Sequence, residues 1–130
     1  VSAVSEAFVV TTPSLSSLKD ADKVINILNS YKLKFVGLIV NRARGDLMLG
    51  NKMMTPEEIC FSLKTELIGV IPEEDYVFLN ASSLPKNSES FKAFSLLAGN
   101  VISNKKKFYD VTKKYSGFWG SIRKGLKKTL

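Results

Sequence analysis

The sequence predicts an α/β protein built on a parallel sheet, and three observations support this fold class. Short apolar runs rich in β-branched residues alternate with longer segments whose apolar residues recur every three or four positions. The short runs are continuously apolar, which is typical of parallel strands covered on both faces. The 130 residues are 45% hydrophobic and 24% charged, values that a folded domain has and a disordered chain lacks.

The first predicted β-α-β unit occupies residues 8–41. Its first strand, over 8–12, ends at Pro13, and its second strand, over 35–40, ends at Asn41. Between them, three serines can cap the start of a helix: Ser14, Ser16 and Ser17. The apolar face of this amphipathic helix follows helical spacing, with Leu15, Leu18, Ala21, Ile25 and Leu28.

A polar segment over 42–54 is predicted to be a loop that precedes the second unit. A helix is then expected to begin at Thr55, because Pro56 suits the first helical position and Glu58 completes a capping box. A third strand over 67–71 ends at Pro72, and residues 82–90 are loop-like. A last helix is indicated by the apolar positions Phe91, Phe94, Leu97, Ala98, Val101 and Ile102.

Three strands make a small sheet for a doubly wound fold, and its edges would be open without further strands. The chain also begins at Val1 rather than at methionine. We therefore expect residues 1–104 to be the C-terminal part of a larger domain with a doubly wound, mostly parallel sheet. Residues 105–114 are expected to be a basic linker, and residues 115–130 an amphipathic helix.

The composition excludes several classes of site. Without histidine, and with Cys60 as its one cysteine, the chain cannot form a disulfide framework, a Cys/His zinc site or a histidine triad. No apolar run approaches the roughly 20 residues that a membrane span needs. We expect Cys60, beside Ile59 and Leu63, to be buried packing. The three methionines, Met48, Met53 and Met54, are expected to pack locally in the polar loop.

The positive charge of the chain is concentrated at its end. Residues 1–104 hold 10 Lys and Arg against 11 Asp and Glu, whereas residues 105–130 hold 9 Lys and Arg against Asp110 alone. A basic tail on a nearly neutral domain indicates binding to an anionic surface, either lipid headgroups or nucleic acid.

The last sixteen residues are typical of a helix that lies in a membrane interface. On a helical wheel, all the large apolar residues fall in one arc of about 120°, and all the cations fall outside it. The predicted membrane-binding residues are Phe118, Trp119, Ile122, Arg123, Lys124, Leu126, Lys127 and Lys128. Binding by one tail would be weak, so two tails on a dimer would bind far better. The alternatives are packing of the arc on the chain's own core, and nucleic-acid binding, which would leave the arc without a role.

The order of the motifs resembles the MinD family, the septum site-determining ATPases of the deviant Walker A (MinD/ParA) group. The resemblance rests on the segments 8–13, 16–23, 40–42, 67–74 and 81–82, and on the tail motif 118–122. It implies the C-terminal portion of a P-loop NTPase domain that binds ATP and dimerises around it. By this resemblance, the ATP-bound dimer sits on the inner face of the cell membrane and helps place the division septum.

The resemblance also implies roles for individual residues. Asn41 would hydrogen-bond the adenine edge, and the other cofactor-binding positions would be Arg42, Pro72, Glu73 and Asp75. Physically, an amide offers both a donor and an acceptor, and the carboxyl ends of parallel strands line nucleotide crevices. Otherwise Asn41 is an ordinary turn residue, and 73–75 is a solvated turn that caps the next helix.

Partners are implied in the same way. Ser16, Asp20 and Asp22 would bind partner proteins, which in this family are the division inhibitor MinC and a topological factor such as MinE. Anionic membrane lipids and a second copy of the chain complete the expected partners, with no specific nucleic acid. The alternative for these three residues is a capped, solvated helix.

The chain departs from the family in ways that limit its activity. It has no Gly-rich phosphate loop and no Asp-x-Pro-x-Gly segment, which the family carries upstream together with its Mg²⁺-binding residues. It also lacks the family's glycine near Ser83 and Pro85. We therefore expect no catalytic residue in this chain and no ATP hydrolysis by it alone. Two other hypotheses stay open: a stand-alone peripheral membrane-binding module, and a sibling ATPase such as a flagellar-number regulator or, less compatibly with the tail, a ParA-type DNA partitioner.

Overall fold

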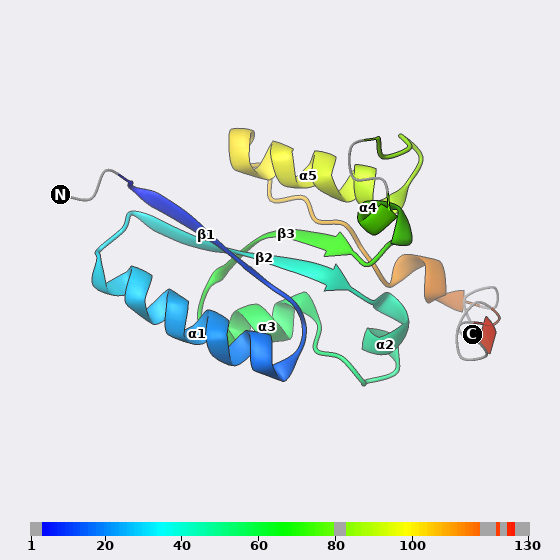
Figure 1. The fold of residues 1–130 in the computed structure, drawn as a ribbon, viewed down its shortest axis with the longest axis horizontal. Helices are drawn as coiled ribbons and strands as arrows, with labels where there is room; N and C mark the ends of the chain where they lie inside the picture. Colours follow the sequence, from blue (N-terminus) through cyan, green and yellow to red (C-terminus); the bar gives the residue numbers. More distant parts are fainter. Residues whose placement is uncertain (1–3, 80–82, 118–121, 123–124, 127–130) are drawn as a thin grey trace.

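A computed structural model of the chain describes residues 4–79, 83–117, 122 and 125–126 (Figure 1). Three parallel strands form one sheet in the order β1-β2-β3: β1 is Glu6–Thr11, β2 is Phe35–Ala43 and β3 is Glu66–Pro72. The predicted α/β class with a parallel sheet is thus confirmed. The strands extend beyond the predicted apolar runs: β1 begins at Glu6, β2 continues to Ala43, and β3 runs from Glu66 to Pro72.

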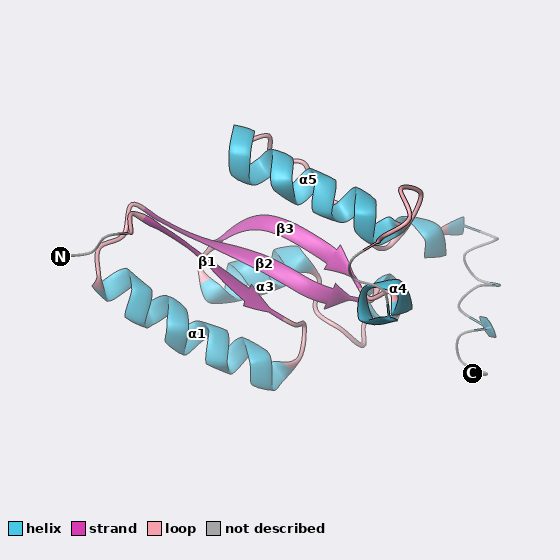
Figure 2. Cartoon of the chain, turned by 45° about the horizontal axis from the view of Figure 1, so that its top comes forward, coloured by secondary structure: helices cyan, strands magenta, loops and turns pink. Residues whose placement is uncertain are grey.

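Helices lie on both faces of this sheet, as the continuously apolar strands predict. Helices α1 (Leu15–Ser30) and α3 (Pro56–Leu63) lie on one face, and α5 (Glu89–Ser103) lies on the other (Figures 1 and 2). The first two connect adjacent parallel strands in the same direction, and right-handed crossovers put such helices on the same face. The core between them and the sheet includes Val9, Leu18, Ala21, Ile25, Leu38, Val40, Ile59, Leu63 and Val70.

The predicted helix starts are confirmed by their caps. The Ser14 hydroxyl accepts a hydrogen bond from the Ser17 backbone N–H at 3.3 Å. At α3 the capping box is complete, because the Thr55 hydroxyl accepts from the Glu58 N–H and the Glu58 carboxylate accepts from the Thr55 N–H. Each cap satisfies backbone donors that the first helical turn leaves without partners.

The segment predicted as a loop over 42–54 is only partly a loop. Strand β2 continues to Ala43, and a short helix, α2, follows at Gly45–Leu49. A Cβ atom at Gly45 would collide with the Val111 carbonyl oxygen, so only glycine lets the two segments approach this closely. A second short helix, α4 (Asp75–Leu79), follows β3 directly. Neither helix has enough residues to show a helical period in the sequence.

The segment after α5 returns across the domain toward the carboxyl ends of the strands (Figure 1). Asn100 directs this return: its side-chain amide donates to the carbonyls of Ile68 and Lys107, each at 2.8 Å, and accepts from the Lys107 N–H at 2.9 Å. Val111 and Tyr115 are then buried, and the 3₁₀-helix η1 (Lys113–Tyr115) packs against α2. Tyr115 is the first residue of the range 115–130 that the sequence assigns to the amphipathic tail, but the structure buries it in the domain, with 4% of its surface exposed.

Candidate functional site

A cleft of about 440 Å³ lies at the carboxyl ends of β2 and β3. Its lining includes all five residues that the sequence assigned to a cofactor: Asn41, Arg42, Pro72, Glu73 and Asp75. The first two come from the end of β2, and the others come from the end of β3 and the turn into α4. The carboxyl ends of neighbouring parallel strands lie at the same edge of the sheet, which brings together residues about 30 positions apart.

Local backbone geometry turns Asn41 toward this edge. The pairing of β2 with β3 shifts register between Val40 and Ala43, and Arg42 within the shift has a left-handed φ of 56°. The Asn41 side-chain oxygen accepts the Arg42 backbone N–H at 2.9 Å. This bond engages the amide oxygen and leaves the amide nitrogen as a donor at the cleft.

A forked ion pair borders the cleft. Arg42 donates to one carboxylate oxygen of Glu73 from Nε at 3.1 Å and from Nη2 at 2.8 Å. Arg44 lies 3.9 Å from the other Glu73 oxygen and pairs with Asp46 at 2.7 Å. A hydrogen bond from Arg44 to Asp46 is the main cause of the raised pKa of Arg44. These pairs fix the Glu73 carboxylate beside Asn41 and compensate its charge.

Glu74, which the sequence did not assign to the cofactor, also lines the cleft and turns toward α5. Its carboxylate accepts the backbone N–H of Ser90 at 2.7 Å and of Glu89 at 3.2 Å. Burial raises the pKa of Glu74, but hydrogen bonds from Ser90 and Glu89 lower it by more, so the net pKa lies below the ordinary value. The acidic turn thus does cap a helix, but the helix is α5 and not the next one along the chain.

The remaining wall of the cleft is apolar and was missed by sequence reasoning. It consists of Val77, Phe78 and Leu79 on α4. The available signal was the apolar run that follows the acidic turn, but five residues are too few to establish a helical period. The cleft therefore joins a polar wall from β2 and the turn to an apolar wall from α4.

The predicted partner-binding residues lie on α1, and all three are exposed. Ser16 and Asp20 share one stripe of the helix, one turn apart. Asp22 is roughly 200° around the helix from Asp20, so it faces a different direction. Asp20 pairs with Lys23 at 3.4 Å, and Asp22 accepts from Asn26 at 3.3 Å. The structure thus brings two of the three residues together.

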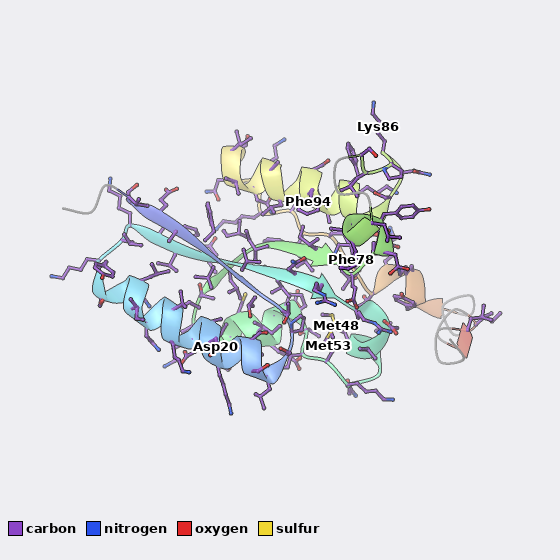
Figure 3. The ribbon with its side chains drawn as sticks, in the orientation of Figure 1. Asp20, Met48, Met53, Phe78, Lys86 and Phe94 are labelled. Atoms are coloured by element: carbon purple, nitrogen blue, oxygen red, sulfur yellow. The ribbon has the colours of Figure 1, made fainter. Side chains whose placement is uncertain are left out.

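A second groove, of about 510 Å³, opens beside the start of α1. Its lining includes Leu15 and Leu18 from α1 together with the three methionines, Met48, Met53 and Met54. Met48 is buried in the core and the other two are half-buried, so the local packing expected of them holds only in part. Figure 3 shows Met48 and Met53 near one another.

Most of the predicted membrane-binding residues lie outside the described part of the chain: Phe118, Trp119, Arg123, Lys124, Lys127 and Lys128. The two described members, Ile122 and Leu126, are helical and are 44% and 63% exposed. In the described ranges no helix has the length and hydropathy of a membrane-crossing segment, and no three Cys, Asp or Glu side chains gather as a metal would require.

Known proteins similar to this chain are septum site-determining proteins. A putative MinD of Oltmannsiellopsis viridis is 38% identical over 82 residues, which are 63% of this chain and 26% of that protein. A putative MinD of Chlorella vulgaris is 30% identical over 129 residues, covering 95% of this chain and 46% of the relative. No protein-family model matches the chain.

Solved structures agree with these relatives. The MinD cell division protein of Aquifex aeolicus superposes with a TM-score of 0.74 at 30% identity, over 81% of this chain and 47% of its own. An Aquifex aeolicus MinC:MinD complex gives a TM-score of 0.71 at 33% identity, over 78% of this chain and 44% of that one. The chain spans less than half the length of each of these proteins. By sequence and by fold the chain is therefore MinD-like, and its partial coverage fits a C-terminal portion of such a protein.

Proposed function

We propose that this chain is the C-terminal portion of a MinD-like ATPase that acts in placing the division septum at the inner face of the cell membrane. In this proposal the chain binds the adenine of ATP, attaches to anionic lipid and presents α1 to a division inhibitor. The observation that carries the proposal is that Asn41 and the turn at 72–75 line one cleft at adjacent strand ends.

The cleft residues fit a nucleobase. The Asn41 amide nitrogen can donate to a ring nitrogen, and the Arg42–Glu73 pair borders the polar side. Pro72, although buried, also lines the cleft. The phosphates and Mg²⁺ would be held by residues that this chain does not carry, since it has no Gly-rich phosphate loop. Bound MgATP would supply the phosphoryl-transfer chemistry, and the role of this chain would be to orient the base.

Titration of the ¹⁵N-labelled chain with adenosine tests the base site. We expect amide shifts confined to 41–43 and 72–79. Asn41→Ala should weaken binding roughly 10-fold, the value of about one well-placed hydrogen bond. Asn26→Ala on the exposed face of α1 is the matched control, because it also removes an amide but lies far from the cleft. Two results would contradict the base site: adenosine-induced shifts that are the same in Asn41→Ala as in the wild-type chain, or no adenosine binding by the wild-type chain.

Membrane attachment is proposed for the tail. The support is the separation of apolar and cationic residues on the helical wheel and the exposure of Ile122 and Leu126. Trp119→Glu with Ile122→Glu should weaken co-sedimentation with phosphatidylglycerol vesicles by at least about 100-fold, since two apolar side chains no longer enter the interface. Ile102→Glu is the control, because this exposed residue lies on α5 and outside the tail.

The same variants separate the alternatives. Binding to vesicles that survives the double substitution would refute the membrane role. Binding to duplex DNA that is stronger than binding to vesicles, and that falls steeply with salt, would favour the nucleic-acid alternative. Vesicle binding without any adenosine binding would favour a stand-alone membrane module, which the presence of a basic tail on a chain without a phosphate loop also fits.

A partner surface is proposed at the start of α1. One similar structure is a MinC:MinD complex. In this chain α1, which carries the exposed Ser16 and Asp20, also contributes Leu15 to the groove lined by the methionines. A groove of flexible methionines adapts to an apolar partner surface. Leu15→Lys should abolish pull-down of a MinC-type inhibitor, whereas Ile27→Lys, an equally charged change at another exposed position of α1, should not. Equal retention by both variants would place the partner elsewhere.

A further inference from the structure

Phe78 is unusual among the residues that line the cleft. It lies on α4, and 91% of its surface is exposed. Figure 3 shows Phe78 where α4 meets the carboxyl ends of β2 and β3. An exposed phenyl ring leaves a large apolar area in contact with water. Exposed apolar groups that gather at a concave site are typical of ligand contacts.

The surroundings of Phe78 divide the cleft into two kinds of wall. Asn41, Arg42 and Glu73 make a polar wall with fixed hydrogen-bonding groups. Phe78 and Leu79 contribute apolar surface to the same cleft, and both side chains are exposed, at 91% and 70%. Tyr76, on the same helix, is 55% exposed but does not line the cleft. The aromatic ring at the cleft is therefore a property of position 78 and not of α4 in general.

A nucleobase has a polar edge and two apolar faces, and the two walls match these parts. The edge can meet Asn41, and a face can lie on an aromatic ring, because every base has a π-face that stacks on aromatic side chains. We propose that Phe78 is the stacking platform for the base of the bound nucleotide. The inference rests on the proposed nucleotide site and adds to it a specificity residue that lies outside the polar set assigned from the sequence.

Stacking has a consequence that hydrogen bonding alone does not have. Stacking grows with the area of the aromatic surface, so a two-ring purine gains more from Phe78 than a one-ring pyrimidine does. Loss of the ring should therefore weaken the binding of purine nucleosides more than that of pyrimidine nucleosides. A larger ring at the same position should restore the preference for purines. A residue with a merely structural role would change binding of the two classes equally.

The test is a ¹⁵N titration of the full 130-residue chain with adenosine and, separately, with uridine. Phe78→Ala should weaken adenosine binding about 10-fold and uridine binding less, and Phe78→Trp should restore adenosine binding to at least the wild-type value. Tyr76→Ala is the matched control, because it removes an exposed aromatic ring from the same helix outside the cleft. Circular dichroism of each variant checks that the fold is intact.

The outcomes separate this inference from the proposed function. Adenosine binding that depends on Asn41 but is unchanged in Phe78→Ala overturns the stacking role and leaves the nucleotide site standing. Equal weakening by Phe78→Ala and Tyr76→Ala also overturns it, since α4 would then act only as a support. No adenosine binding by the wild-type chain overturns both.

Discussion

The Glu74 carboxylate accepts the backbone N–H of Ser90 at 2.7 Å, so a residue of the cleft turn holds the first turn of α5. The adjacent Glu89 is in turn paired with Lys114 at 2.7 Å. Lys114 lies in η1 and is positioned over the ring of the buried Tyr115. A continuous set of polar contacts thus links the candidate base site to the residues that immediately precede the predicted membrane-binding tail.

The first prediction concerns Glu74 and pH. The pKa of Glu74 is lowered in the folded chain, so its ionised form stabilises the fold. This contribution is complete above the unfolded pKa of about 4.3 and is lost as pH falls through the lower, folded pKa. Glu74→Gln should lower the free energy of unfolding by about 1 kcal/mol at pH 7, and the difference from wild type should shrink toward pH 3.

Urea denaturation at several pH values measures this effect. Asp75→Asn, the neighbouring change, is the control, because Asp75 is exposed and the described bonds from this turn to the N–H groups of Glu89 and Ser90 are made by Glu74. A Glu74→Gln penalty that is the same at pH 7 and pH 3 would show that the carboxylate charge does not stabilise the start of α5.

The second prediction concerns the Glu89–Lys114 pair. Both side chains are half-buried. Removal of one leaves the charge of the other partly desolvated and without its partner. Glu89→Ala should loosen η1 and speed amide exchange at 111–115 by about 5-fold or more, corresponding to about 1 kcal/mol. Lys23→Ala breaks an exposed ion pair on α1 and should change exchange nowhere. Unaltered exchange at 111–115 in Glu89→Ala would show that η1 is held by Tyr115 packing alone.

The third prediction concerns the contact between α2 and the returning segment. Gly45→Ala places a methyl group against the Val111 carbonyl, so the two segments must separate. The free energy of unfolding should therefore fall by about 2 kcal/mol. In Gly50→Ala the nearest atom to the new methyl group is the Asp46 carbonyl oxygen at 3.4 Å, so stability should change little. Thermal unfolding of both variants measures the contrast, and equal melting temperatures would mean that residues 108–112 do not pack as described.

The fourth prediction uses the single cysteine. Burial, with a smaller effect of Glu57, raises the pKa of Cys60 to about 11, and the thiol packs against the core. At pH 8 its alkylation by iodoacetamide should be on the order of 100-fold slower than that of a free thiol, because the thiolate is the reactive form. Unfolding in urea should abolish the difference. Rapid alkylation of the native chain at pH 8 would show that packing of α3 on the core does not shield the Cys60 thiol.

The sequence alone predicted the parts of the fold that depend on local patterns. Continuous apolar runs located β1, β2 and β3, and the capping box at Thr55 located α3, because such signals lie within a few residues of the element that they specify. The sequence also indicated that Asn41 and residues 72–75 would lie close together, since strand ends in a parallel sheet share one edge.

Only the tertiary structure decided which of these residues meet and what else joins them. The cap of α5 by Glu74, 16 residues before Ser90, and the burial of Tyr115 both depend on long-range packing that no local pattern encodes. The apolar wall with Phe78 belongs to a helix too short to have a visible period. Contacts between distant segments arise when the chain closes around its core, so their partners are set by the fold as a whole and not by spacing in the sequence.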